Sequence, residues 1–327
     1  MNPLIVYKKS VYELYKDSPD PEVRAYAQEN EIKLKKGSEE QKRTLETITS
    51  AVQHLGMSYK ELYRAELQNL SPEDFAKHDL IISVGGDGTF LEVSHYLHQA
   101  DVPLLGVNSD PNSSVGFFCS AYRENFAEIL ENIGTLPRTQ LPRLQLIRND
   151  ISLPELVLND VLFAHHNPAS NTRFVLEVSK EPISNQEKKD ISNEDNKEKK
   201  NKKEKEFEPS ISYRGSNGIL ACTSSGSTAW MYQLGEEPFD FSCSLLKYRV
   251  RDARGEQGRF AQELKITSQT REGKIWIDGA HLSYDLGLGG VLEIQPGTPL
   301  LVVGDLQEKR KKWLKKQKAK ETKEVKL

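Results

Sequence analysis

The stretch LIISVGGDGTFL, at Leu80–Leu91, constrains the fold of this chain more than any other. Its first five residues are almost wholly apolar, which predicts a buried strand. The glycines of Gly85–Gly88 then permit a tight turn and a close approach of the backbone to a ligand. A helical apolar pattern opens at Thr89, so the carboxylate of Asp87 lies on a strand-to-helix turn.

This turn has two interpretations. Backbone N–H groups at a turn or a helix start favour phosphate, whereas a lone carboxylate would repel it. Asp87 therefore fits a residue that holds a metal or accepts a proton in phosphoryl transfer. The alternative is a tight turn with an aspartate cap, and the motif alone leaves both open.

Length and composition limit the class of protein. A chain of 327 residues predicts one large domain or two. Three cysteines without metal-ligand spacing predict reduced thiols in a reducing compartment. No apolar run approaches the ~20 residues of a membrane span, and we expect no signal peptide or presequence before Leu4–Tyr7. We therefore predict a cytoplasmic protein without membrane attachment.

The first part of the chain alternates strands with helices. Helices are expected over Arg123–Ile133 and from Ser38 onward, where Ser38 and Gln41 form a candidate capping box. Leu80–Val84, the helix that opens at Thr89 and Pro103–Asn108 follow one another at the spacing of a βαβ unit. Such a unit predicts a parallel, Rossmann-like sheet in an α/β domain over residues 1–138. The expected strands are Leu4–Tyr7, Tyr59–Tyr63, Leu80–Val84 and Pro103–Asn108.

After Pro137 the pattern changes to short strand-like runs separated by turn residues. This predicts an antiparallel, sandwich-like all-β domain over residues 139–303, and an α+β protein overall. One of the expected strands is Leu156–Phe163. Asn185–Glu206 is almost wholly polar or charged and cannot bury a core, so we expect a disordered insertion between two paired strands.

Residues 304–327 form a basic C-terminal tail on an acidic body. Glu308–Leu327 holds ten Lys or Arg and three Glu, which is +7 and leaves −3 − 7 = −10 for the remainder. Such a tail could contact nucleic acid, a membrane or an acidic face of the protein's own oligomer. We favour a mostly solvated tail anchored at its start, and expect no nucleic-acid partner.

Two polar motifs interrupt the β-rich part. Asn159-Asp160 breaks an apolar run, and a buried polar pair is costly unless it is hydrogen-bonded. The pair either lies at a strand end or holds an adenine edge or ribose hydroxyls. Thr223–Trp230, TSSGSTAW, gathers hydroxyls around a glycine. It suits a ligand-binding loop or a serine-rich turn with Thr228 near a helix N-cap.

Together the three motifs resemble those of the NAD kinases. That family carries GGDG in an N-terminal α/β domain, an Asn-acidic pair in the C-terminal domain and a loop of the form TPTGSTAY. The resemblance spans roughly residues 80–303 and keeps the family order. Gly106–Gly116, GVNSDPNSSVG, is similar to the divergent mitochondrial-type branch, which implies a homodimer. We expect a homodimer or tetramer and favour the dimer. Further similarities are Gly106-Val107-Asn108, Arg173 and Ile277-Asp278-Gly279.

The chain also departs from the family pattern. Asp160 replaces the commoner Glu, Trp230 replaces Tyr, and Thr223-Ser224-Ser225 replaces Thr-Pro-Thr. Asn217 stands where many members have Asp, which puts its ribose contact in doubt.

The resemblance implies transfer of the γ-phosphoryl of ATP to the 2′-hydroxyl of the adenosine ribose of NAD. Mg²⁺, or another divalent metal, would bridge the ATP phosphates, with no protein metal ligands implied. Asp87 would be the catalytic residue, and Gly85, Gly86 and Gly88 would cradle the phosphates. The implied NAD-binding residues are Asp87, Gly88, Asn159, Asp160, Asn217, Ser225, Thr228 and Ala229.

Two other functions remain open from the sequence. Lipid kinases of the diacylglycerol or sphingosine type also use GGDGT, but an Asn-Glu usually follows it, and here Phe90-Leu91-Glu92 follows. A non-catalytic NAD-binding protein would bind the ligand without turnover. His165-His166 does not predict a metal site, because adjacent side chains on a strand point to opposite faces. We expect them to be surface or loop residues.

Overall fold

The computed structural model describes residues 1–98, 101–111, 115–179 and 207–324. They form two compact units, Met1–Leu141 with Thr298–Leu327, and Pro142–Gly297. Residues 298–303 group with the first unit, whereas the sequence assigned them to the β-rich domain. Among the described residues, no helix has both the length and the apolar content needed to cross a membrane.

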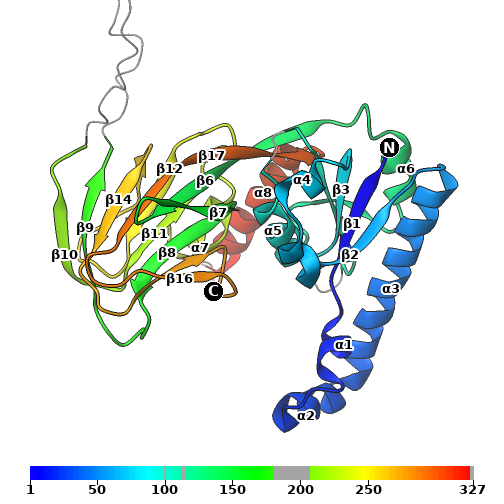
Figure 1. Ribbon diagram of the computed structural model, residues 1–327, viewed down its shortest axis with the longest axis horizontal. Coiled ribbons are helices and arrows are strands. Elements are labelled where there is room, and N and C mark those ends of the chain that lie inside the picture. Colours follow the sequence, from blue (N-terminus) through cyan, green and yellow to red (C-terminus); the bar gives the residue numbers. More distant parts are fainter. Residues whose placement is uncertain (99–100, 112–114, 180–206, 325–327) are drawn as a thin grey trace, which may run out of the picture. The chain divides into compact units, whose positions relative to one another are not determined.

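The first unit contains the expected parallel sheet, in the order β2-β1-β3-β4, of which Figure 1 shows β2, β1 and β3 side by side. β5 and the end of β17 (Val291–Val303) also pair with β4. Every residue of β3 is buried, as is usual for a parallel strand with both faces covered. The strands are β1 (Pro3–Tyr7), β2 (Lys60–Tyr63), β3 (Leu80–Gly85), β4 (Leu104–Asn108) and β5 (Cys119–Tyr122).

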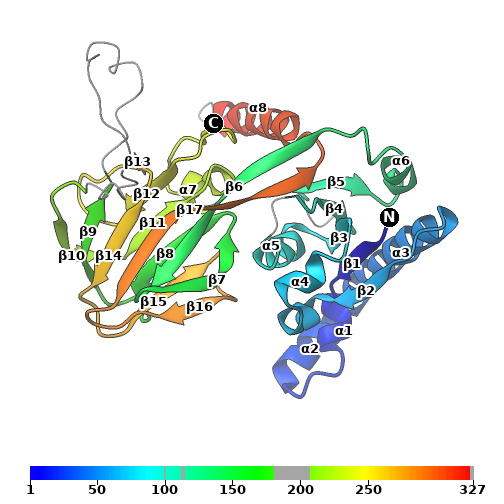
Figure 2. The ribbon, with the colours of Figure 1, turned by 45° about the horizontal axis from the view of Figure 1, so that its top comes forward.

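Helices cover this sheet. Ile5 and Ile82 pack in one apolar cluster with Ile48 of α3 and Phe126 of α6, and α5 contacts β3. Figure 2 shows the long α3 beside β1 and β2. The helices of this unit are α1 (Val11–Tyr15), α2 (Pro21–Glu29), α3 (Glu31–His54), η1 (Arg64–Asn69), α4 (Pro72–Phe75), α5 (Asp87–His95), α6 (Phe126–Glu131) and α8 (Leu306–Glu324).

The predicted helix start at Ser38 is wrong. Helix α3 begins at Glu31, so Ser38 lies inside it, buried, and accepts a hydrogen bond from Ser10 Oγ at 2.9 Å. A capping box forms instead at Ser10 and Glu13, at the start of α1. The first turns of α3 are mostly exposed and rich in lysine, so they lack the apolar period on which the prediction relied.

The second unit contains antiparallel strands in two sheets, as predicted for the β-rich half. Phe174 and Ile266 of one sheet share an apolar cluster with Phe163 and Ile275 of the other, so the core lies between the sheets. One sheet has β6 (Arg138–Arg148), β7 (Ile151–Val157), β9 (Thr172–Val178), β10 (Ile211–Ser216), β14 (Leu264–Ser268) and β17 (Val291–Val303). The other has β8 (Asp160–His165), β11 (Ile219–Cys222), β12 (Leu246–Val250), β13 (Arg259–Ala261), β15 (Gly273–Ile277) and β16 (Ser283–Asp285).

The single strand predicted over Leu156–Phe163 is in fact two. β7 ends at Val157 and β8 begins at Asp160, so Asn159 lies between them. The short helices η3 (Gly226–Thr228) and α7 (Trp230–Gln233) follow β11. The two polar motifs of this unit therefore lie at the break between β7 and β8 and in the segment after β11.

The predicted insertion, Asn185–Glu206, lies outside the described residues. The strands on either side of it, β9 and β10, pair antiparallel, and an isolated bridge joins Ser179 to Phe207. This pairing provides a hairpin that a short turn can close.

We therefore predict that deleting Asn185–Glu206, with a short glycine-containing turn in its place, preserves the fold and the solubility. The physical reason is that this composition cannot bury a core, while the flanking strands have their own hydrogen bonds. Thermal unfolding by circular dichroism measures the outcome. An insoluble product, or a large drop in Tm, would mean that the segment is an ordered part of the β-rich unit.

Candidate functional site

The GGDG motif joins β3 to α5. Gly86 is the N-cap residue and Asp87 is the first residue of the helix, two residues before the predicted start. Gly85 is required by space, because a Cβ there would lie 2.3 Å from Thr89 Oγ1. The N–H groups of the first turn of a helix have no intrahelical partner, so the turn offers donors beside a carboxylate.

The carboxylate of Asp87 is held by the backbone. Its Oδ2 accepts a hydrogen bond from the amide of Phe117, and its Oδ1 accepts one from the amide of Phe118, both at 2.9 Å. Each carboxylate oxygen has two lone pairs, so the amides fix the group and leave capacity for a ligand hydroxyl. We call Gly85–Gly88 with Phe117 and Phe118 the aspartate turn.

Lys8 lies beside the aspartate turn and was missed by the sequence analysis. It follows β1, whose Tyr7 is paired with Val84 of β3. Burial lowers the pKa of the Lys8 ammonium, and the charge of Arg64 lowers it further. Lys8, Lys33 and Lys36 contribute to the lining of a pocket of about 360 Å³ in the first unit. Lysines in such a place suit phosphate groups.

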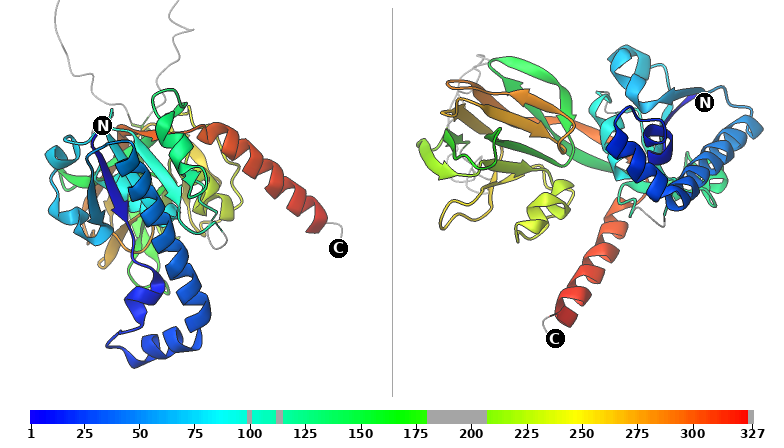
Figure 3. Two further views of the ribbon diagram at one scale, coloured as in Figure 1. Left: turned by 90° about the vertical axis from the view of Figure 1, so that its right-hand side faces the viewer. Right: turned by 90° about the horizontal axis from the view of Figure 1, so that it is seen from below.

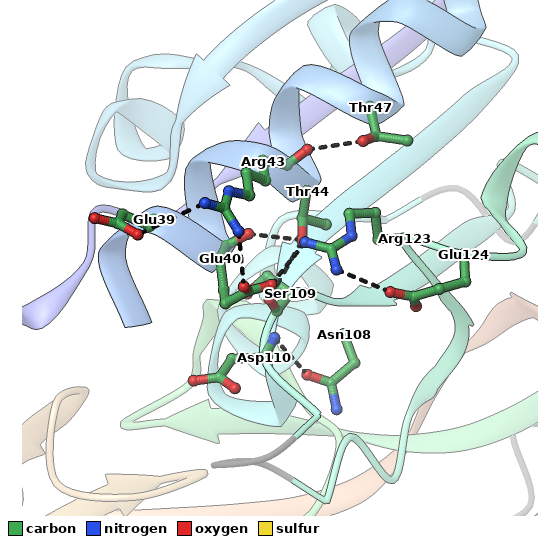
Figure 4. Close-up of polar contacts among 10 residues, drawn as sticks. All are labelled: Glu39, Glu40, Arg43, Thr44, Thr47, Asn108, Ser109, Asp110, Arg123 and Glu124. Atoms are coloured by element: carbon green, nitrogen blue, oxygen red, sulfur yellow. Dashed lines mark hydrogen bonds and ion pairs between the residues drawn. The ribbon is translucent and has the colours of Figure 1, made fainter. Parts of the chain in front are cut away.

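One wall of this pocket is tied to the segments that follow β4 and β5 (Figure 4). Glu40 of α3 accepts a hydrogen bond from Arg123 Nη1 at 2.6 Å. Thr44 of the same helix donates from Oγ1 to the carbonyl of Ser109 at 3.3 Å. Both contacts fasten α3 to the segments at the carboxyl end of the sheet, where ligands bind in open α/β folds.

In the second unit, Asp278 organises the predicted Asn-acidic pair. Its Oδ2 accepts from the amide of Leu158 at 2.9 Å, and its Oδ1 accepts from Asn159 at 2.7 Å and from Asp160 at 2.9 Å. Asp278 has a positive φ of 49°. The sequence contained Asp278 in a family-like motif, but it gave no sign of these partners.

The hydroxyl loop packs on the same pair. Thr223 donates from its amide to the carbonyl of Asn159 at 2.9 Å and from its Oγ1 to the carbonyl of Leu158 at 2.5 Å. A Cβ at Gly226 would lie 2.0 Å from the carbonyl oxygen of Asn159, so only glycine fits there. The structure thus brings together two motifs that are far apart in the sequence. We call residues 158–160 with residues 223–229 the hydroxyl site.

The predicted residues of the loop have different surroundings. Ser225 Oγ is buried and has no hydrogen-bond partner within the described chain. Such an orphan group is costly until something pairs with it, as a ligand would. Thr228 donates to the carbonyl of Ser225 at 3.1 Å, and the amide of Ala229 donates to Gly226. The N-cap residue of α7 is Ala229, so Thr228 lies next to the helix N-cap, as the alternative interpretation of this loop expected.

Buried charges surround the hydroxyl site. Burial raises the pKa of Asp160 to about 7, and the charge of Asp278 acts in the same direction. Burial lowers the pKa of Arg143 to about 9, with Asp278 opposing the change. Groups shifted in this way often mark functional sites.

Two pockets adjoin the hydroxyl site. Asp160, Trp230 and Trp276 help to line one of about 200 Å³. Another, of about 540 Å³, is lined in part by Asn217 and both tryptophans. Asn217 donates to Asp252 Oδ2 at 2.6 Å.

Further residues of the larger pocket were not among the predicted site residues. Arg251 lies with its guanidinium carbon 4.9 Å from the ring centre of Trp230. His165, half-buried at the end of β8, and His166, exposed directly after it, both line this pocket. Adjacency along the chain gave no signal that both would face one pocket.

The predicted site residues therefore fall into two groups. Gly85, Gly86, Asp87 and Gly88 belong to the first unit, and the other predicted NAD-binding residues belong to the second. Within the parts of the chain that the structure describes, no group of three or more His, Cys, Asp or Glu side chains is placed to hold a metal ion.

Comparisons with known proteins bear on both groups. The family model described as the ATP-NAD kinase N-terminal domain matches residues 6–136. The chain is 32% identical over 257 residues to the NADH kinase of Arabidopsis thaliana, covering 69% of this chain and 72% of that protein. It is 29% identical over 289 residues to a protein of Oryza sativa subsp. japonica named "Probable NADH kinase", covering 80% of each.

A solved structure has a similar fold. The NAD kinase of Archaeoglobus fulgidus, in complex with ATP, aligns with a TM-score of 0.60 at 18% identity, over 95% of this chain and 96% of that one. This likeness extends through both units. Because the chain is 32% identical to the Arabidopsis thaliana NADH kinase over 69% of its own length and 72% of that protein, it belongs to the NAD kinase family.

Proposed function

We propose that this protein transfers the γ-phosphoryl of ATP to the 2′-hydroxyl of the adenosine ribose of NAD or NADH. The bond from the 2′-oxygen to the γ-phosphorus forms, and the bond from the γ-phosphorus to the oxygen bridging it to the β-phosphorus breaks. ADP leaves, and the hydroxyl proton passes to a carboxylate. The observation that carries this proposal is the Asp87 carboxylate, fixed by two amides at a glycine turn in a chain of this family.

Asp87 would orient the 2′-hydroxyl and accept its proton. Phosphoryl transfer depends mainly on positioning and charge stabilisation, and a carboxylate held at both oxygens is already positioned. Gly85, Gly86 and Gly88 would present backbone N–H groups to the donor phosphates, with Lys8 nearby as a positive charge.

A divalent cation, Mg²⁺ in our proposal, would offset the charge of the ATP phosphates. We propose that the cation enters with ATP, because Mg²⁺ at such sites is usually bound by substrate phosphates and water with only one or two carboxylates. The chain's own contribution is then the turn that receives the phosphates.

The hydroxyl site would bind the dinucleotide. Asn159 and Asp160 would take adenine or ribose, and Ser225, Thr228 and Ala229 would shape the adenine side. The orphan hydroxyl of Ser225 supports this role. Asn217 would also contact ribose, although its side-chain amide already donates a hydrogen bond to Asp252. We further propose a homodimer or tetramer located in the cytoplasm.

A phosphorylation assay with purified protein tests the function against its rivals. ATP and polyphosphate serve as donors, with NAD, NADH and diacylglycerol as acceptors. Formation of NADP or NADPH is the expected result. Phosphorylation of diacylglycerol alone would identify a lipid kinase, and dinucleotide binding without turnover would identify a non-catalytic protein. Family membership favours the dinucleotide.

For Asp87→Asn, we predict that turnover falls by roughly 10²–10⁴-fold, the range usual for a positioned acid or base. Binding of the dinucleotide, measured by calorimetry, should change little. Asp79→Asn is the matched control, because this exposed aspartate lies just before the other end of β3 and accepts from the amide of Asn2. Near-wild-type turnover in Asp87→Asn would remove Asp87 from the mechanism.

The pKa of Asp160 predicts a pH dependence of dinucleotide binding. Burial raises this pKa to about 7, so the group is mostly protonated below that pH. A protonated carboxyl is a poorer acceptor for ribose hydroxyls, so KM for the dinucleotide should fall as the pH rises from about 6 to about 8, and binding should release a proton.

Asp160→Asn should flatten this profile, while Asp285→Asn, on the exposed strand β16, should keep it. Steady-state kinetics at each pH, with ATP saturating, measures the effect. A wild-type KM that does not vary with pH would contradict a contact between Asp160 and the acceptor.

A further inference from the structure

The C-terminal helix α8 is fixed to the first unit at its start (Figure 3). Thr139 Oγ1 donates to the carbonyl of Gly304 at 2.7 Å and accepts from the amide of Leu306 at 3.2 Å. Ser120 Oγ donates to the carbonyl of Val303 at 2.6 Å. A Cβ at Gly304 would lie 2.1 Å from Ser120 Oγ, so the chain is closely packed just before α8. These contacts fix the position at which the helix begins.

Lys309, in the first turn of α8, reaches the segment that holds Asp87. Its ammonium donates to the carbonyls of Gly116 and Cys119. Those carbonyls flank Phe117 and Phe118, whose amides donate to Asp87. A single side chain thus bridges both ends of the dipeptide that fixes the carboxylate.

Aromatic contacts hold the same dipeptide on both sides. Trp313, one turn after Lys309, packs edge-on against Phe117 with ring centres 6.3 Å apart. Phe118 stacks on Phe90 of α5 at 5.1 Å. The segment is therefore clamped between the C-terminal helix and the helix that begins with Asp87.

The environment of Lys309 agrees with a fixed internal role. Burial lowers the pKa of its ammonium, with Cys119 and Asp87 acting in the opposite direction. Its ammonium also lies 5.9 Å from the ring centre of Tyr122. A solvated tail residue would have none of these features, so the first turns of α8 anchor the start of the tail to the first unit.

We propose that Lys309 is a positioning residue for phosphoryl transfer: by bridging the carbonyls of Gly116 and Cys119, it holds the amides of Phe117 and Phe118 in the orientation that fixes Asp87. This inference rests on the proposed kinase function. It makes the C-terminal helix part of the active site, although it is more than two hundred residues from the GGDG motif in sequence.

Lys309→Met tests the proposal, since methionine keeps most of the apolar length and removes the charge and the donors. We expect kcat to fall by roughly 10–100-fold, the size of effect that a displacement of a catalytic group can produce, with KM for ATP and for the dinucleotide changed little. Lys311→Met is the matched control, an exposed lysine of the same helix, and should retain wild-type kcat.

Two readouts distinguish positioning from a general loss of structure. In the Asp87→Asn background, Lys309→Met should cause a much smaller further loss, because a residue that acts through Asp87 has little left to act on. Hydrogen–deuterium exchange should also rise in the peptide containing residues 116–119, and not across β3 or α3.

Each other outcome overturns the inference. A raised KM for ATP with unchanged kcat would make Lys309 a phosphate ligand. Equal losses in the wild-type and Asp87→Asn backgrounds would show that it acts independently of Asp87. Wild-type kcat with unchanged exchange would remove any role. If the unmutated protein phosphorylates neither NAD nor NADH, the proposed function itself has failed, and the exchange measurement still reports whether Lys309 holds the segment.

Discussion

Carboxylates that accept hydrogen bonds from backbone amides organise both sites of this protein. Asp87 accepts from two consecutive amides, and Asp278 accepts from three. Hydrogen bonds to an ionised acceptor are shorter and stronger than neutral ones. Each carboxylate therefore fixes a short loop without needing a long side chain, and the other site residues take their positions from these loops.

The two carboxylates differ in what they leave available. Asp87 lies at a partly open turn, so its remaining lone pairs can meet a ligand. Asp278 is buried, and its oxygens are used to hold the strand break on which Asn159 and Asp160 lie. We interpret Asp87 as a reacting group and Asp278 as a support, although both use the same kind of hydrogen bond.

Two titratable groups near Asp278 have shifted pKa values. Asp160 and Arg143 are both buried near Asp278. Burial raises the pKa of Asp160 and lowers that of Arg143, so in each case it favours the neutral form of the group. Burying charge is unfavourable unless it is paired and hydrogen-bonded. Within the hydroxyl site, Asp160 is thus a group whose protonation a ligand can change, which a purely structural turn would not need.

Local patterns determined much of the fold and part of the site. The apolar run before Gly85 and the helical period after Thr89 predicted the strand, turn and helix correctly, because each depends on neighbouring residues. The same reasoning missed the first turns of α3, which lack an apolar period. It also joined β7 to β8, since apolar content alone does not separate one buried strand from two.

Only the tertiary structure decided what holds the site residues. Asp278 meets the amide of Leu158 across 120 residues, and Lys309 meets the carbonyl of Gly116 across 193. In both cases the partner is a backbone group, and apart from the missing amide of proline every residue carries the same amide and carbonyl. A sequence can therefore mark the aspartate or the lysine, but it carries no sign of which backbone group it will meet.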